Sequence, residues 1–146
     1  MEQIAPILRT IDYKFEDINA GGCAFFARRL AKVLKQKRII KNFEYVIMTP
    51  PEYKHLIEVS AETNSVTSVF PASHVMLKVQ DYVIDSTGVY QFKKYEYKYD
   101  GYCTKVIVPK KLINKITSSR YHHLWNWMFD RKDLPHIEKL LNELIK

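Results

Sequence analysis

The sequence predicts an α+β fold in which helices pack on an antiparallel sheet. Three observations support this class: an amphipathic helix starting at residue 23, several β-rich segments between residues 43 and 108, and a helical pattern in the last third. Strands grouped between helices, rather than alternating with them, are typical of α+β proteins. The 146 residues fit a single domain, residues 1–146, because two separate cores would be thin at this length.

The first clear helix is predicted to begin at Cys23, directly after Gly21 and Gly22. Apolar residues recur at helical spacing along residues 23–34. Four basic residues take the other side of this helix: Arg28, Arg29, Lys32 and Lys35. Cys23 is therefore expected in the first turn of an amphipathic helix.

Strands are predicted at residues 43–48 and 104–108, and weaker strand signals occur at 57–59 and 66–70. Two β-rich runs, 74–79 and 82–87, flank Gln80 and Asp81, which read as a tight hairpin loop although neither is glycine. Helices are predicted at 121–129 and at 134–144, the second with Pro135 in its first turn.

The hairpin places two polar residues on one face. With a two-residue loop, Val79 pairs with Tyr82 and Met76 with Asp85, so His74 and Asp85 become diagonal neighbours about 7–8 Å apart at the backbone. Side chains of these two types can span that distance. A loop of odd length would break the parity, so this inference depends on the register.

These positions suit thiol chemistry. A cysteine reacts as the thiolate, and both a helix N-terminus and a nearby imidazolium lower its pKa. A carboxylate behind the histidine fixes the tautomer and the orientation of the ring. Glycines beside Cys23 allow close approach of a substrate, and unpaired amides of the first helical turn can stabilise an oxyanion.

Each of the three residues also has a purely structural interpretation. Cys23 suits a small buried residue at a helix start, since free cysteine is commonly buried. His74 suits the first residue of a strand. Asp85 suits a cap for the turn at residues 86–88, a common use of aspartate. The residue types alone leave both interpretations open.

Three segments, 19–23, 74–79 and 82–88, together resemble the transglutaminase-like branch of the papain-like cysteine enzymes. This branch includes transglutaminase-type peptidases and amidases and arylamine N-acetyltransferases, and the layout is also similar to small phage and bacterial proteins. The resemblance maps the nucleophile to Cys23, the base to His74 and the third member of the triad to Asp85. It implies a papain-like arrangement, with the nucleophile helix packed on an antiparallel sheet and helices at the C-terminus.

The implied activity is that of a cysteine-dependent hydrolase or acyltransferase. It would act on a peptide, an isopeptide or a side-chain amide through a thioester, without a cofactor, and with Asn19, Gly21 and Gly22 supporting the oxyanion or the nucleophile. The resemblance covers roughly residues 15–90 and departs from the family at two positions. Gly22 replaces an aromatic residue common before the cysteine, and Met76 stands where an aromatic often follows the histidine. The substrate pocket is therefore not transferable.

Two other functions compete with this one. The formal charge is +7, and tyrosines alternate with lysines along residues 90–102, which suits a nucleic-acid-binding domain or an inactive binding protein on the same fold. The alternative, which we favour, is a strand or lid whose tyrosines pack on one side and flank the cleft. The chain lacks the ligand spacing of a metal site, a signal peptide and a membrane-spanning run, so a cytoplasmic protein is expected.

Overall fold

The computed structural model describes residues 1–19, 21–66, 72–97, 101–121 and 128–146. Its helices are α1 (Ala5–Lys14), α2 (Cys23–Gln36), α3 (Lys54–Thr63), α4 (Lys110–Ile116) and α5 (Leu134–Leu144). Its strands are β1 (Glu44–Thr49), β2 (His74–Val79), β3 (Tyr82–Asp85), β4 (Gly88–Gln91) and β5 (Thr104–Val108). Short 3₁₀ turns at Glu2–Ile4, Pro51–Tyr53 and Arg131–Asp133 lead into α1, α3 and α5.

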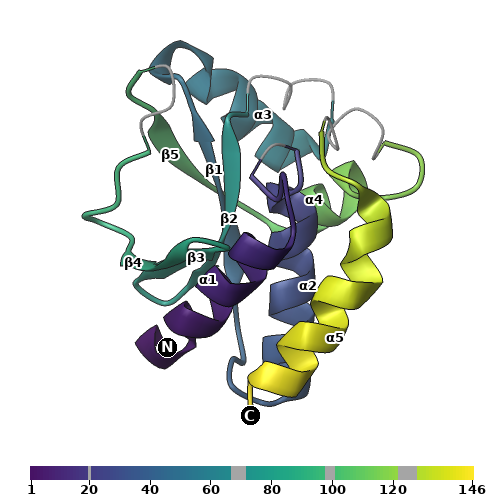
Figure 1. The fold of residues 1–146 in the computed structure, drawn as a ribbon. Coiled ribbons are helices and arrows are strands. Elements are labelled where there is room, and N and C mark those ends of the chain that lie inside the picture. The colour runs from purple at the N-terminus through teal and green to yellow at the C-terminus, as the bar shows by residue number, and fades with distance from the viewer. Residues whose placement is uncertain (20, 67–71, 98–100, 122–127) are drawn as a thin grey trace.

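The described strands form one antiparallel sheet in the order β4-β3-β2-β1-β5. Helix α2 lies against β2 and β3 on one face, and α5 lies beside α2 as an outer helix (Figure 1). This arrangement confirms the predicted α+β class, with an N-terminal helix on an antiparallel sheet and a helix at the C-terminal end.

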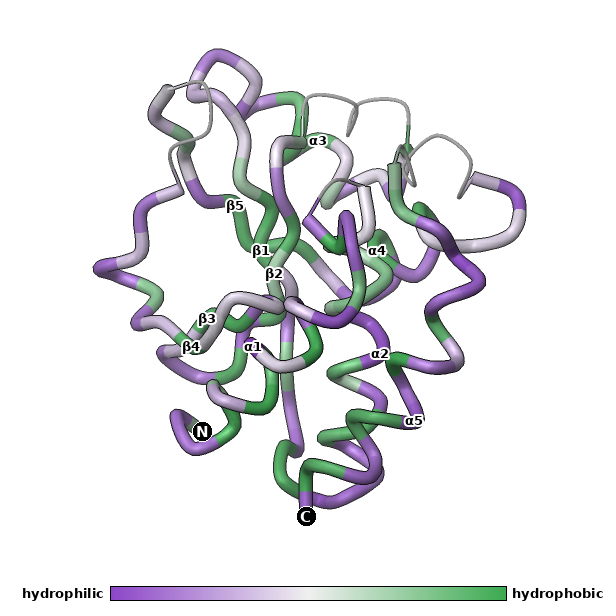
Figure 2. The backbone as a smooth tube through the Cα atoms, viewed as in Figure 1, coloured by the Kyte–Doolittle hydropathy of each residue, from purple (hydrophilic) through white to green (hydrophobic). Residues whose placement is uncertain are grey.

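The two faces of the sheet bury different side chains. Val75, Leu77 and Ile84 point to the helices and join their apolar sides in the main core. Met76 and Val83 point to the opposite face, where they join a smaller cluster covered by the aromatic segment after β4. In Figure 2 the hydrophobic stretches lie on the central strands and in bands along α2 and α5. Each helix therefore buries one side only.

The hairpin of β2 and β3 has the predicted register. Val79 pairs with Tyr82 and Leu77 with Ile84, which places His74 and Asp85 on the same face. Gln80 provides the sharp reversal by adopting a positive φ of 53°. This conformation is uncommon for a residue other than glycine. The sequence of the loop itself therefore did not mark the turn, which was predicted from the two β-rich runs on either side of it.

The strand predicted at residues 57–59 is wrong, because these residues lie inside α3. Ile57 and Ser60 are buried three positions apart on one side of that helix, which ends at Asn64 in the left-handed conformation (φ 58°) typical of a helix C-cap. Helices α1 and α4 and strand β4 were not predicted. Most of the segments predicted at 66–70 and 121–129 lies outside the described residues. In the part of the chain that is described, no helix is long and apolar enough to cross a membrane.

Two glycines determine where α2 begins. Gly21 has φ 104°, in the left-handed region that favours glycine. Gly22 is the N-cap residue, and a Cβ atom there would lie 2.6 Å from the Phe129 ring and 2.7 Å from the Ile18 carbonyl oxygen. The backbone at Gly22 therefore packs closely against the Phe129 ring. This close packing helps to fix the start of α2, where Cys23 is the first residue.

We expect Gly22→Ala to destabilise the protein by about 1–3 kcal/mol, the usual cost of forcing extra atoms into a packed site. Urea denaturation gives the free energy of unfolding. If the Phe129 ring causes much of the cost, Gly22→Ala combined with Phe129→Ala should lose less than the sum of the two single variants. Strict additivity would contradict this explanation.

Candidate active site

Cys23 is the first residue of α2, as predicted. Its side chain is partly exposed, whereas the second cysteine, Cys103, is buried in the cluster on the other face of the sheet. Because the thiol stands at the N-terminus of a 14-residue helix, the helix dipole favours its anionic form. The two cysteines therefore differ in both exposure and electrostatic environment.

His74 and Asp85 form a buried hydrogen-bonded pair. The distance from Nε2 of His74 to Oδ2 of Asp85 is 2.8 Å, and the two residues are 2% and 4% exposed. The antiparallel register brings the first residue of β2 next to the last residue of β3. This contact confirms that the diagonal distance predicted from the sequence is spanned by the two side chains.

The second carboxylate oxygen of Asp85 is also occupied. Oδ1 accepts hydrogen bonds from the backbone N–H of Thr87 at 2.8 Å and from the Thr87 hydroxyl at 2.6 Å, and that hydroxyl lies 2.6 Å from the Tyr90 hydroxyl. Asp85 thus caps its turn and orients His74 at the same time, so its two sequence interpretations are compatible. Burial would raise the Asp85 pKa, but the bonds from His74 and Thr87 hold it below its usual value.

The remaining ring nitrogen of His74, Nδ1, is buried. Nδ1 meets the strict geometry of a hydrogen bond with no described group, but the ring interacts with Cys23 through charge and a looser hydrogen bond. Burial would lower the His74 pKa. The bond to Asp85, together with the contact with Cys23, instead raises it to about 9. At neutral pH the ring is therefore an imidazolium.

The thiol responds in the opposite sense. Burial would raise the Cys23 pKa, but the hydrogen bond and positive charge of His74 outweigh it, and the backbone amides of Val75 and Ala24 act in the same direction. The Cys23 pKa consequently lies below that of an ordinary thiol. These three side chains can hold a thiolate–imidazolium pair backed by a carboxylate, which is the resting arrangement of an activated cysteine nucleophile.

The aromatic segment after β4 covers the histidine, which the residue pattern alone did not specify. The Tyr97 ring stacks on the His74 imidazole with a centroid distance of 4.8 Å and an interplanar angle of 8°. Tyr90 and Tyr95 pack against each other and against the smaller cluster. Tyr90, Tyr95 and Tyr97 thus pack on one side, as favoured from the sequence, whereas Tyr102 is exposed and Tyr99 lies outside the described residues.

Asn19 belongs to a polar network that was only partly anticipated. Its Nδ2 donates to the Ser86 hydroxyl at 3.1 Å, and that hydroxyl donates to Oδ1 of Asp12 at 2.5 Å. Ser86 is fully buried and directly follows Asp85. The network ties α1 and the loop before Cys23 to the end of β3, so Asn19 is held near the candidate site. No sequence signal marked Asp12 or Ser86 for this role.

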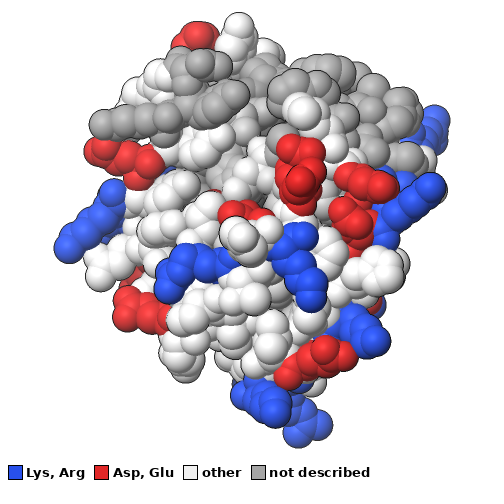
Figure 3. All heavy atoms as spheres, in the orientation of Figure 1, with Lys and Arg blue, Asp and Glu red and all other residues white. Residues whose placement is uncertain are grey.

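The described residues contain no group of three histidine, cysteine or acidic side chains that could hold a metal. His122 and His123 lie outside the described residues. On the face seen in Figure 3, blue and red side chains alternate rather than forming a single basic patch. The constellation at Cys23 is thus the chemically best-defined site in the described part of the chain.

The structure thus brings a cysteine, a histidine and an aspartate together on an α+β fold. No protein-family model, curated protein or solved structure matches the chain.

The rate of Cys23 alkylation should test the ion pair directly. Because its pKa is lowered, we expect the rate at which iodoacetamide modifies Cys23 to fall less between pH 8 and pH 6 than that of an ordinary thiol, which loses about tenfold in rate per pH unit below its pKa. His74→Ala should slow the reaction at pH 6 at least about tenfold. Peptide mapping by mass spectrometry measures this, with buried Cys103 as the internal control. An ordinary thiol profile for Cys23 in the parent protein would contradict the assignment.

Stability should depend on pH through the same pair. A group whose pKa rises on folding, such as His74, adds stability that is complete below its unfolded pKa of about 6.5 and is lost as pH rises through about 9. In Cys23→Ala, Asp85 still raises the His74 pKa but the contribution of Cys23 is lost. Urea denaturation should therefore show the unfolding free energy falling above pH 6.5 by at most about 1.4 kcal/mol per pH unit, over a narrower pH range than in a site with the full shift. Cys23→Ala/His74→Gln should not show this fall.

The parent protein should show a shallower fall over the same range. The lowered pKa of its Cys23 thiol favours loss of that proton on folding, which offsets the proton that His74 retains. A slope as steep as that of Cys23→Ala would mean that the thiol is not ionised in the fold.

Proposed function

We propose that this protein is a cysteine-dependent hydrolase or acyltransferase of the transglutaminase-like, papain-like type. It acts on a peptide, an isopeptide or a side-chain amide through a thioester. The observation that carries the proposal is the buried His74–Asp85 pair placed beside a thiol at the start of a helix. If Cys23 were only a packing residue, its stability would not require a neighbouring His74 imidazolium held by the Asp85 carboxylate.

In the first half-reaction the Cys23 thiolate attacks the carbonyl carbon of the substrate. A carbon–sulfur bond forms and the carbonyl electron pair moves to the oxygen. Backbone N–H groups at the start of α2 and the second amide proton of Asn19, whose first is donated to Ser86, stabilise this oxyanion. As it collapses, the carbon–nitrogen bond breaks, His74 Nδ1 gives its proton to the departing amine, and a thioester remains.

In the second half-reaction the neutral His74 accepts a proton from water or from an incoming amine. The oxygen or nitrogen attacks the thioester, the carbon–sulfur bond breaks, and the thiolate–imidazolium pair is restored. Asp85 stays ionised and keeps Nε2 of the ring occupied throughout. Tyr97 covers the ring face and limits access of water to the imidazole. Whether water or an amine arrives decides between hydrolysis and transfer.

Intact-mass spectrometry with a panel of activated acyl donors and glutamine- or lysine-containing peptides tests the proposal. We expect the parent protein to gain one acyl group on Cys23 and to release it with water or with an added amine. Cys23→Ala should gain none, and His74→Ala should form it at least about 100-fold more slowly. Asp85→Asn should also slow acylation, because the wrong tautomer of His74 is then favoured.

Cys103→Ser is the matched control and should behave as the parent protein does. An inactive binding protein on this fold would show no acylation despite rapid alkylation of Cys23. A nucleic-acid-binding domain would show binding that falls steeply with salt and is unchanged by Cys23→Ala. Either outcome would remove the enzyme proposal.

A further inference from the structure

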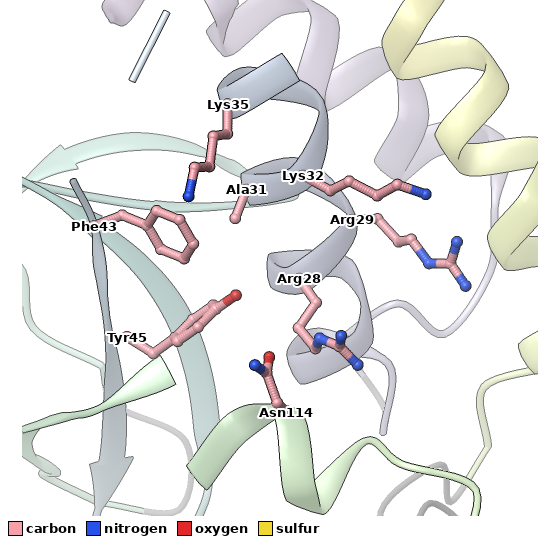
Figure 4. A pocket seen from close by; sticks show the side chains of 8 residues that line it. All are labelled: Arg28, Arg29, Ala31, Lys32, Lys35, Phe43, Tyr45 and Asn114. Atoms are coloured by element: carbon pink, nitrogen blue, oxygen red, sulfur yellow. The ribbon is translucent and has the colours of Figure 1, made fainter. Parts of the chain in front are cut away.

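A second concavity lies between α2, β1 and α4. Its volume is about 400 Å³, within the range of small-molecule sites. Figure 4 shows basic side chains of α2 on one wall, the rings of Phe43 and Tyr45 on the other, and Asn114 at the end. Cys23, His74 and Asp85 do not line this pocket. It is therefore a different site from the candidate active site.

The wall formed by α2 carries four basic residues, Arg28, Arg29, Lys32 and Lys35, and acidic side chains nearby neutralise only some of them. Arg29 and Lys32 form ion pairs with Glu138 at 3.2 Å and 2.6 Å and point away from the pocket toward α5. Arg28 instead donates to the neutral hydroxyl of Thr117 at 2.9 Å, and Lys35 forms no ion pair with any described residue. None of the lining residues is acidic.

The two cations without an acidic partner among the described residues, Arg28 and Lys35, stand seven positions apart on α2 and both line the pocket. Lys32 lies between them in the sequence, but Glu138 neutralises its charge. An anion bound against this wall would be attracted by both of these cations. This pair is thus a reason to expect a negatively charged ligand.

Tyr45 supplies an independent observation. The residue is only 2% exposed, its hydroxyl points toward α2 in Figure 4, and it makes no hydrogen bond with the residues that the structure describes. The Phe43 ring packs edge-on against it at 5.6 Å. The hydroxyl oxygen is not among the buried polar atoms that lack a partner, so it is open to the pocket and available to donate to a ligand.

We propose that this pocket binds a small organic phosphate. The phosphate lies between Arg28, Lys35 and the Tyr45 hydroxyl, and the apolar or planar part of the ligand lies against Phe43. Two cations and a hydroxyl donor match the several acceptor oxygens and the double charge of a phosphate monoester. One bounded concavity suits a small molecule, whereas a nucleic-acid strand requires a groove that follows its backbone.

Titration calorimetry on the full chain, in a buffer free of phosphate, tests this with adenosine 5′-monophosphate as the probe. We expect saturable one-to-one binding that Lys35→Gln and Arg28→Gln each weaken about tenfold or more. Unphosphorylated adenosine should not bind. Lys93→Gln and Lys139→Gln, which remove exposed charges outside the pocket, are the matched controls and should leave the affinity unchanged.

Tyr45→Phe separates ligand binding from folding. Removing a hydroxyl without a partner should leave the stability of the free protein equal or higher, yet it should weaken binding of the nucleotide severalfold. Cys23→Ala should bind as the parent protein does, so failure of the thiol chemistry would not affect this result.

Three outcomes would overturn the proposal. The first is the absence of nucleotide binding at millimolar concentration. The second is an affinity that Lys35→Gln does not change. The third is binding of a single-stranded oligonucleotide by a protein that does not bind the mononucleotide, which would identify a nucleic-acid surface instead.

Discussion

The buried hydrogen bond between His74 and Asp85 constrains much of the molecule around it. Removing one partner from a charged pair this deep typically costs about 3–5 kcal/mol, so contacts that satisfy its other atoms matter. Thr87 satisfies the far oxygen of Asp85, and Tyr97 covers the ring of His74. The second ring nitrogen has no partner of normal hydrogen-bond geometry among the described residues, and the ring interacts electrostatically with Cys23. The register of the hairpin is thus set by polar as well as apolar contacts.

The part of the site that could be predicted is the part that depends on local rules. Alternation of side chains along β2 and β3 fixes which residues share a face once the loop length is known, and this placed His74 beside Asp85. Likewise, Gly21 and Gly22 before an amphipathic run indicated the start of α2 and so the position of Cys23. Both inferences use spacing within about twelve residues, over which backbone geometry is well determined.

What could not be predicted depends on contacts between distant segments. Residues 57–59 have the composition of a strand, yet burial of Ile57 against the main core favours a helix there. The stack of Tyr97 on His74 joins residues 23 positions apart across an irregular segment. The bond from Ser86 to Asp12 joins residues 74 positions apart in the sequence. Serine hydroxyls and tyrosine rings such as those of Ser86 and Tyr97 are common on protein surfaces without any partner. Only the folded structure therefore identifies the groups that they contact.

Two electrostatic features of helix α2 concern different ends of the helix: the thiol of Cys23 at its start, and the basic residues that follow it. Its N-terminus favours an anion, and the lowered pKa of the Cys23 thiol at that end is consistent with this preference. Lys35, in the last turn, also suits the dipole. Arg28 gains nothing from the dipole, because it lies in the first half of the helix beside the neutral hydroxyl of Thr117. The lowered pKa of Cys23 accounts for one end of α2, and the charge of Arg28, which has no acidic partner among the described residues, is the one that the proposed phosphate would neutralise.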